Sequence, residues 1–191
     1  MNESDTNRIR QLRERRMRVA EEKERAEKRA KRGGYVAAKA SVALRTHLTL
    51  DAFDVDAKLP INFERKPNLA ECPGLVAAHV SEKRARHIAE CCDATIGPQA
   101  GRLGFDEYSY VGTASVASTN FTALLDAATS LHDSVLFCPN DSDSIVLIDY
   151  YNVGGLSRDV GFSIVIQGSQ LEAKLAICFD NSVSLEGARA R

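Results

Sequence analysis

The chain changes its chemistry at Gly33-Gly34, and this change limits what each part can fold into. Residues 8 to 32 contain twelve Lys or Arg and five Glu, a net charge of +7, and too few apolar side chains to form a core. Residues 33 to 191 contain thirteen Lys or Arg and nineteen Asp or Glu, a net charge of −6. The sequence therefore predicts two parts, a basic arm over residues 1–34 and a folded acidic domain over residues 35–191.

The arm has the pattern of an exposed helix. Ser4 or Asp5 can cap its start, and nothing interrupts a helix before Arg32. Gly33-Gly34 is typical of a C-cap, and we expect a hinge there. Four pairs at i,i+4 spacing add about 0.3 kcal/mol each at low salt. They are Glu14 with Arg18, Glu21 with Arg25, Glu24 with Lys28 and Glu27 with Lys31.

The basic residues of the arm form the candidate binding site. Arginine suits phosphate because its planar guanidinium can donate two parallel hydrogen bonds to one anion. The tip of the arm is the most basic part, since it carries six Arg against Glu14. The sequence predicts that RNA phosphates are bound by Arg8, Arg10, Arg13, Arg15, Arg16, Arg18, Arg25, Lys28, Arg29, Lys31 and Arg32.

Two other interpretations of the arm stay open. One is a solvated spacer with no ligand. The other is a dimeric coiled coil, but the seam that a heptad repeat would use contains two charged residues and two Ala, which disfavours a stable pair. That seam is Ile9, Leu12, Arg16, Val19, Lys23, Ala26 and Ala30.

The body has mostly the alternating apolar pattern of β-strands. Ser81 and Asn120 can each cap a short helix, with apolar residues at helical spacing over 85–92 and 121–128. Because strands outnumber helices without a βαβ rhythm, we expect an all-β fold: an eight-stranded antiparallel jelly-roll sandwich with two short inserted helices, carrying the basic helical arm. The strands are expected at 40–50, 61–63, 75–80, 105–117, 135–138, 145–150 and, as a closing hairpin, 162–167 with 171–179.

Few residues indicate catalysis. The sequence has no phosphate loop, dinucleotide fingerprint or nucleophile elbow, so we predict no enzyme, no catalytic residue and no cofactor. A chance pair of Cys138 with His132 is the remaining nucleophilic possibility.

Metal binding is weakly indicated. His87 and Cys91 lie at i,i+4 spacing, but a zinc site needs a second pair, so we predict no metal. Other possible ligands nearby are Cys72, His79 and Cys92. The acidic clusters are expected to be solvated turns, with calcium bound at a subunit interface as the alternative. They are Asp51, Asp54 and Asp56, and Asp141 and Asp143.

The five cysteines are odd in number and irregularly spaced, which favours free thiols in a reducing compartment. Residues 1–32 lack the apolar run of a signal peptide. The longest apolar run of the body is too short to cross a bilayer, so we expect no membrane partner.

The order of these segments resembles the coat proteins of bromoviruses and cucumoviruses, small icosahedral plant RNA viruses. Residues 111–125 followed by 134–137 resemble their strand, helix and strand passage, and residues 161–166 with 171–179 resemble their closing hairpin. The basic arm agrees with theirs in composition.

The resemblance implies a structural capsid protein that self-assembles into an icosahedral shell and packages single-stranded RNA through its Arg-rich arm. It would be found in virions and in the host cell cytoplasm, and its partners would be RNA and further copies of itself. The alternative is a cellular RNA-associated or ribosome-associated structural protein with a basic helical extension. A second alternative is an enzyme or zinc module around His87 and Cys91.

Overall fold

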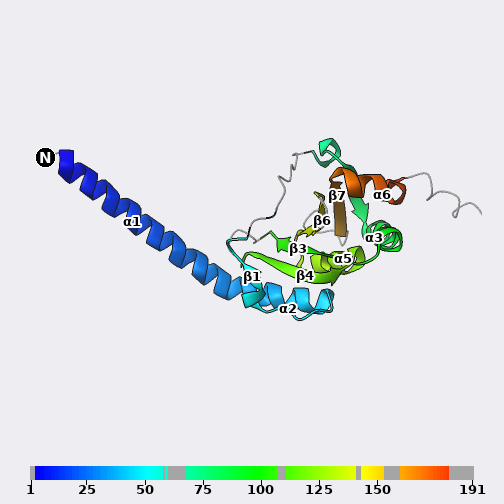
Figure 1. Cartoon of the computed structure of the whole chain (residues 1–191), viewed down its shortest axis with the longest axis horizontal. Helices are drawn as coiled ribbons and strands as arrows, with labels where there is room; N and C mark the ends of the chain where they lie inside the picture. Colours follow the sequence, from blue (N-terminus) through cyan, green and yellow to red (C-terminus); the bar gives the residue numbers. More distant parts are fainter. Residues whose placement is uncertain are drawn as a thin grey trace, which may run out of the picture.

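The computed structural model describes residues 3–57, 59, 68–106, 111–140, 143–152 and 160–180. They form one antiparallel sheet with helices packed on it, and a long helix that leaves this body (Figure 1). The predicted all-β jelly-roll sandwich is wrong. In the described residues there is a single sheet, and helices take the place of a second sheet over one of its faces.

In the described part of the chain the sheet has seven strands, in the order β1-β4-β3-β5-β6-β7-β2, and all neighbours are antiparallel. The interior place of β6 agrees with its apolar run, and the strands predicted at 75–80, 135–138, 145–150 and 162–167 are confirmed. The strands are β1 (Phe53–Asp54), β2 (Leu75–Ser81), β3 (Gln99–Phe105), β4 (Thr113–Thr119), β5 (Val135–Pro139), β6 (Ile145–Asn152) and β7 (Val160–Gln167).

Both faces of the central strands are buried. Successive side chains of a strand point to opposite faces, so Phe137 and Val146 pack under the helices, whereas Leu136 and Leu147 pack on the other face. That second face is covered partly by Cys72 and by Leu69 of a short 3-10 turn, η3 (Leu69–Glu71). Two-sided burial explains why these strands are continuous apolar runs.

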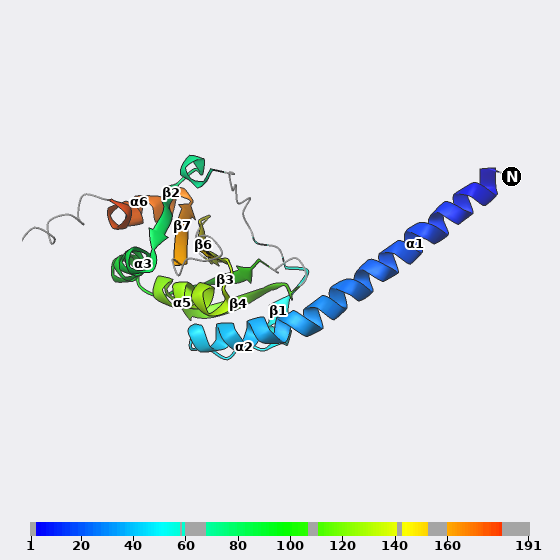
Figure 2. The ribbon, with the colours of Figure 1, turned by 180° about the vertical axis from the view of Figure 1, so that it is seen from behind.

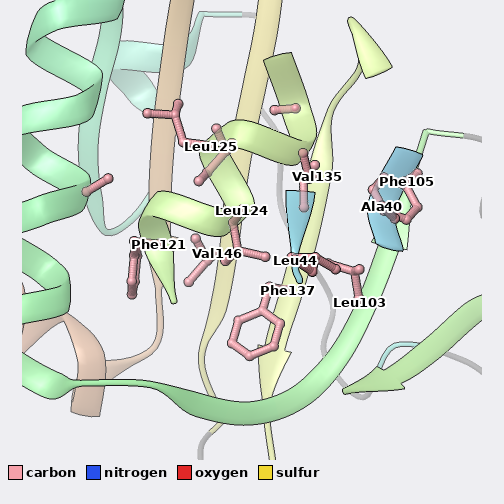
Figure 3. Close-up of a cluster of buried hydrophobic side chains, with 14 of the residues drawn as sticks. Ala40, Leu44, Leu103, Phe105, Phe121, Leu124, Leu125, Val135, Phe137 and Val146 are labelled. Carbon is pink, nitrogen blue, oxygen red and sulfur yellow. The ribbon is translucent and has the colours of Figure 1, made fainter. Parts of the chain in front are cut away.

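Four helices of the described residues lie side by side on the first face, in the order α2, α5, α3, α6 (Figure 2). They are α2 (Gly34–Ala43), α3 (Glu82–Ile96), α5 (Phe121–Leu131) and α6 (Ser169–Phe179). Figure 3 shows Leu124 and Leu125 of α5 lying beside Val135 and Phe137 of β5.

The two predicted helices α3 and α5 are confirmed, with their caps. The Ser81 hydroxyl accepts a hydrogen bond from the backbone N–H of Arg84, and Asn120 accepts one from Ala123. The carboxylate of Asp93 in α3 also accepts the N–H groups of residues 121 and 122 at 2.6 and 3.1 Å. One side chain therefore satisfies donors at the start of α5 and joins it to α3.

The strand predicted at 40–50 is wrong, because residues 34–43 form α2. Val36, Ala37 and Ala40 are its buried residues, at helical spacing, while Val42 is 78% exposed. The segment contains four Ala, the strongest helix former. Its alternating apolar residues also fit a strand, but only the helix buries the stripe against α5.

The closing hairpin is also wrong, because its second half is α6. Leu171, Leu175 and Cys178 are buried at i, i+4 and i+7, while Ile177, an expected inward residue of the strand, is 68% exposed. The Glu172 carboxylate accepts the N–H of Gly168 at 2.8 Å at the start of the helix. A side-chain acceptor at this place satisfies a free helix donor.

The strand predicted at 105–117 is replaced by β3 and β4, with 107–110 between them outside the described residues. The strand over 99–105 was missed because glycines interrupt its apolar pattern. A Cβ on Gly101 would overlap the Phe137 ring, so the close pairing of β3 with β5 requires glycine there. The strand predicted at 61–63 falls outside the described residues.

The arm is helical, as predicted, but the hinge at Gly33-Gly34 is wrong. α1 (Glu3–Lys28) passes through one π-helical turn, η1 (Arg29–Gly33), directly into α2. Gly33 has φ −62° and ψ −38°, and Gly34 has φ −62° and ψ −39°, both ordinary right-handed helix. Figures 1 and 2 show α1 projecting away from the body along this continuous helix.

The helix is fixed to the body where it first touches it. The guanidinium of Arg29 donates hydrogen bonds to the carbonyl oxygens of Val111 (2.8 Å), Leu50 (3.2 Å) and Phe53 (2.6 Å). Gly33 is buried, and a Cβ at this position would overlap the side chain of Leu50. Gly33 therefore allows Leu50 to pack closely against the helix, and the helix does not end at this glycine.

A disulfide joins Cys91 of α3 to Cys178 of α6, with Cα atoms 5.6 Å apart. The prediction that all cysteines are free thiols is therefore wrong for this pair and agrees with the structure only for three buried cysteines: Cys72, Cys92 and Cys138. Spacing could not show the pair, since it depends on the packing of α6 against α3.

Alanine substitutions at the two glycines distinguish a continuous helix from a hinge. We expect G34A to raise the free energy of unfolding by about 0.5–1 kcal/mol, because the position is helical and an added methyl meets open space. G33A should be less stable than G34A, because Leu50 must move. Urea titration measures both. A clear loss of stability in G34A would indicate a glycine-dependent hinge instead.

The disulfide should stabilise the fold. It closes a loop with a sequence separation of 87 residues, for which the chain-entropy model gives about 4.6 kcal/mol. We expect reduction to lower the urea midpoint of the wild-type protein, and C91S to match the reduced wild type whether or not reductant is present. Equal midpoints for oxidised and reduced wild type would contradict the bond, as would five alkylatable thiols in denatured, unreduced protein.

Candidate nucleic-acid interface

The part of the helix that leaves the body is fully open to solvent. Every residue from 7 to 28 is exposed. At 1.5 Å per residue, the 26 residues of α1 extend over about 39 Å. Successive helical residues are about 100° apart, so Arg13, Arg15, Arg16 and Arg18 project in different directions around the axis. The tip is thus a positively charged rod, reachable from any side.

Several cations of the arm are paired along the helix. Lys28 lies 2.7 Å from Glu24, which confirms that predicted pair, and its hydrogen bond holds the pKa of Glu24 below the usual value. Glu14 pairs with Arg10 at 3.0 Å, whereas Arg18 was the predicted partner. Pairs this exposed are weak and exchange readily for a phosphate.

The structure divides the predicted phosphate ligands by position. Arg29 faces the body, and its guanidinium is bonded to three carbonyl oxygens. Arg32 is 39% exposed, 3.9 Å from the Asp133 carboxylate and 4.7 Å from the ring centre of Tyr35. The ligands on exposed helix are Arg8, Arg10, Arg13, Arg15, Arg16, Arg18, Arg25, Lys28 and Lys31.

The possible nucleophilic pair of Cys138 with His132 does not form. Cys138 belongs to the core on the face opposite the helices, while His132 stacks on Tyr150 at 5.1 Å, on the helix side. Burial raises the pKa of the Cys138 thiol to about 11 and that of the Cys92 thiol to about 12. A reactive cysteine needs the opposite shift.

The possible zinc ligands are also separated. Cys91 is in the disulfide, Cys92 is in the core under α3, and Cys72 lies on the other face of the sheet. Asp54 closes a local turn, accepting the N–H groups of Asp56 (2.9 Å) and Ala57 (3.2 Å). Among the described residues, no three His, Cys, Asp or Glu converge as a metal site would require. Asp141 falls outside these residues.

A polar cluster on β6 and β7 was not predicted from the sequence. Asp149 and Ser163 are buried and directly opposite each other in the register, and the Ser134 hydroxyl bonds to Asp149. Ser163 accepts the N–H of His79 at 3.2 Å, and the His79 ring bonds to the Tyr151 hydroxyl at 2.7 Å. The sequence signal that could have indicated it is the presence of two polar residues, Asp149 and Ser163, at buried positions of apolar strands.

The hydrogen bonds of this cluster stabilise the fold. Burial raises the pKa of Tyr151, so its phenol stays protonated at neutral pH and serves hydrogen bonding. The cluster also fixes an irregular edge, because β2 has a register shift between Ala77 and Val80, with His79 at φ 53°.

A cavity of ≈ 380 Å³, lined by both polar and apolar side chains, lies between the end of α2 and the start of α5. The Thr119 hydroxyl lines it and has no hydrogen-bond partner among the described residues, and Arg45 lines it with a left-handed backbone, φ 51°. Asp126 lies at its edge, paired with Arg86 at 2.9 Å.

Comparisons of the chain with protein-family models, curated proteins and solved structures gave no match. None of the helices in the described part of the chain combines the length and apolarity needed to cross a membrane.

The raised thiol pKa values predict slow alkylation. At about pH 8 we expect iodoacetamide to leave Cys92 and Cys138 of the folded protein unmodified, because less than about 1% of either thiol is ionised. Denaturant should make both react quickly. Peptide mass spectrometry locates the modified residues, and rapid modification of either thiol without denaturant would show that it is accessible and ionised.

Proposed function

We propose that this protein is an RNA-associated structural protein that binds the RNA backbone through its projecting basic helix. One observation carries the proposal. A single helix is anchored in the body by Arg29 and Gly33, and holds its six tip arginines on a stretch that is exposed at every described side chain. These are Arg8, Arg10, Arg13, Arg15, Arg16 and Arg18.

Electrostatics supports a polyanionic ligand. The body carries a net charge of −6 over residues 33–191, yet α1 extends away from it (Figure 1). Its positive charge is therefore left available to an external partner. Phosphate contacts of this kind are driven by the release of counterions and carry little base specificity.

The fold does not support the prediction of assembly into an icosahedral shell. The capsid interpretation used a jelly roll and a closing hairpin, and residues 171–179 form α6 instead. The cellular RNA-associated alternative requires only the basic helical extension, so we prefer it.

Neutralising the tip tests RNA binding directly. We expect the variant with all six tip arginines changed to Ala to lose most affinity for a labelled oligouridylate, while circular dichroism shows an intact body. If each guanidinium contacts one phosphate, the slope of log K against log salt should fall by about 4, since a single strand contributes about 0.7 per contact. Fluorescence anisotropy over about 50–200 mM salt measures both quantities.

A control variant removes two cations from the body. Lys83 and Lys174 are exposed on α3 and α6, and K83A/K174A should bind the oligouridylate nearly as well as the wild type. Equal affinity and equal salt slope for wild type and the tip variant would contradict the proposal. A loss as large in K83A/K174A would indicate that the body, and not the arm, holds the RNA.

A further inference from the structure

One stripe of side chains crosses the junction between arm and body. Lys28, Arg32, Tyr35 and Lys39 follow each other at intervals of four, three and four residues, which places them on one side of a continuous helix. The next stripe of this helix faces inward, with Gly33, Val36 and Ala40 buried. The first stripe therefore lies beside the buried stripe, along the margin of the body.

Tyr35 is the centre of this stripe. Its side chain is exposed (40%), although the neighbouring Val36 is fully buried. The Arg32 guanidinium carbon lies 4.7 Å from the ring centre, and the Lys39 ammonium lies 5.8 Å from it. An exposed aromatic ring between two cations is the combination that single-stranded nucleic acid sites use, with a base on the ring and phosphates on the cations.

We infer that Tyr35 is a stacking platform for an unpaired base of single-stranded nucleic acid, with Arg32 and Lys39 holding the adjacent phosphates. The inference rests on the proposed function and deepens it, because the arginine rod accepts any phosphate backbone, whereas a stacking ring requires an unpaired base. The longer contact of Lys39 with the ring leaves that cation room to move toward a phosphate as a base arrives.

The charges around Tyr35 agree with this ligand. Arg32 lies 3.9 Å from the carboxylate of Asp133, which is only 8% exposed and accepts the N–H of Ser134 at 2.9 Å. This carboxylate is thus partnered within the protein, and the two charged groups that contact the ring, those of Arg32 and Lys39, are both positive.

The test compares Y35A, Y35L and Y35F on full-length protein. The probes are an unstructured RNA strand with 2-aminopurine in place of one base, the same sequence as DNA, and a duplex RNA. For Y35A and Y35L we expect single-strand affinity to fall by about 5- to 150-fold, the range for one lost base stack, with duplex affinity unchanged. Y35F should keep both affinities and the quenching of 2-aminopurine, and Y35L should keep the fold.

The outcomes separate this inference from the function beneath it. Unchanged single-strand affinity and quenching in Y35A and Y35L, with wild-type protein still binding RNA, would overturn the stacking platform and leave the arm proposal standing. An equal fall for single strand and duplex would also overturn it. Failure of wild-type protein to bind any probe at low salt would overturn both. Loss confined to the RNA or the DNA strand would support the platform and identify the preferred nucleic acid.

Discussion

The three hydrogen bonds donated by Arg29 hold together the parts of this molecule that matter most for its proposed function. They join the helix to carbonyl oxygens at Leu50, Phe53 and Val111, in segments far apart in the sequence. Hydrogen bonds from a charged donor are worth about 1.5–3 kcal/mol each, so this junction is costly to open. The missing Cβ of Gly33 lets Leu50 pack against the helix at the same place. The direction in which α1 leaves the body follows from this contact.

The two halves of the long helix are stabilised in different ways. α1 has only weak side-chain pairs along it and buries nothing on the body, and an isolated helix of this kind is marginal in water. α2 is stabilised by packing on α5. Because the two are continuous, the buried half supplies the nucleus that the exposed half lacks. A rod that is ordered before it meets its ligand loses less conformational entropy on binding.

A segment could be predicted from the sequence when its apolar residues fit the spacing of a helix or of a strand, but not both. α3 and α5 were predictable from their caps Ser81 and Asn120 and from apolar residues at helical spacing. α2 and α6 were not, because their apolar residues fit both a strand and a helix, and only packing on α5 and α3 selects the helix. The arginines of the arm were evident from composition. Three features depend on tertiary packing and had no local signal in the sequence. They are the hydrogen bonds of Arg29 to the body, the exposure of Tyr35 and the Cys91–Cys178 disulfide.

The most direct test of a fixed, continuous helix is a spin-label distance measurement between Val19 in α1 and Ser115 in β4. Both side chains are exposed, and the three cysteines outside the disulfide can be replaced beforehand. An arm held by Arg29 across a helical Gly33-Gly34 predicts one narrow distance distribution by electron–electron double resonance, in the presence and in the absence of RNA. A broad distance distribution in the free protein would contradict the anchored helix and support a hinge at Gly33-Gly34.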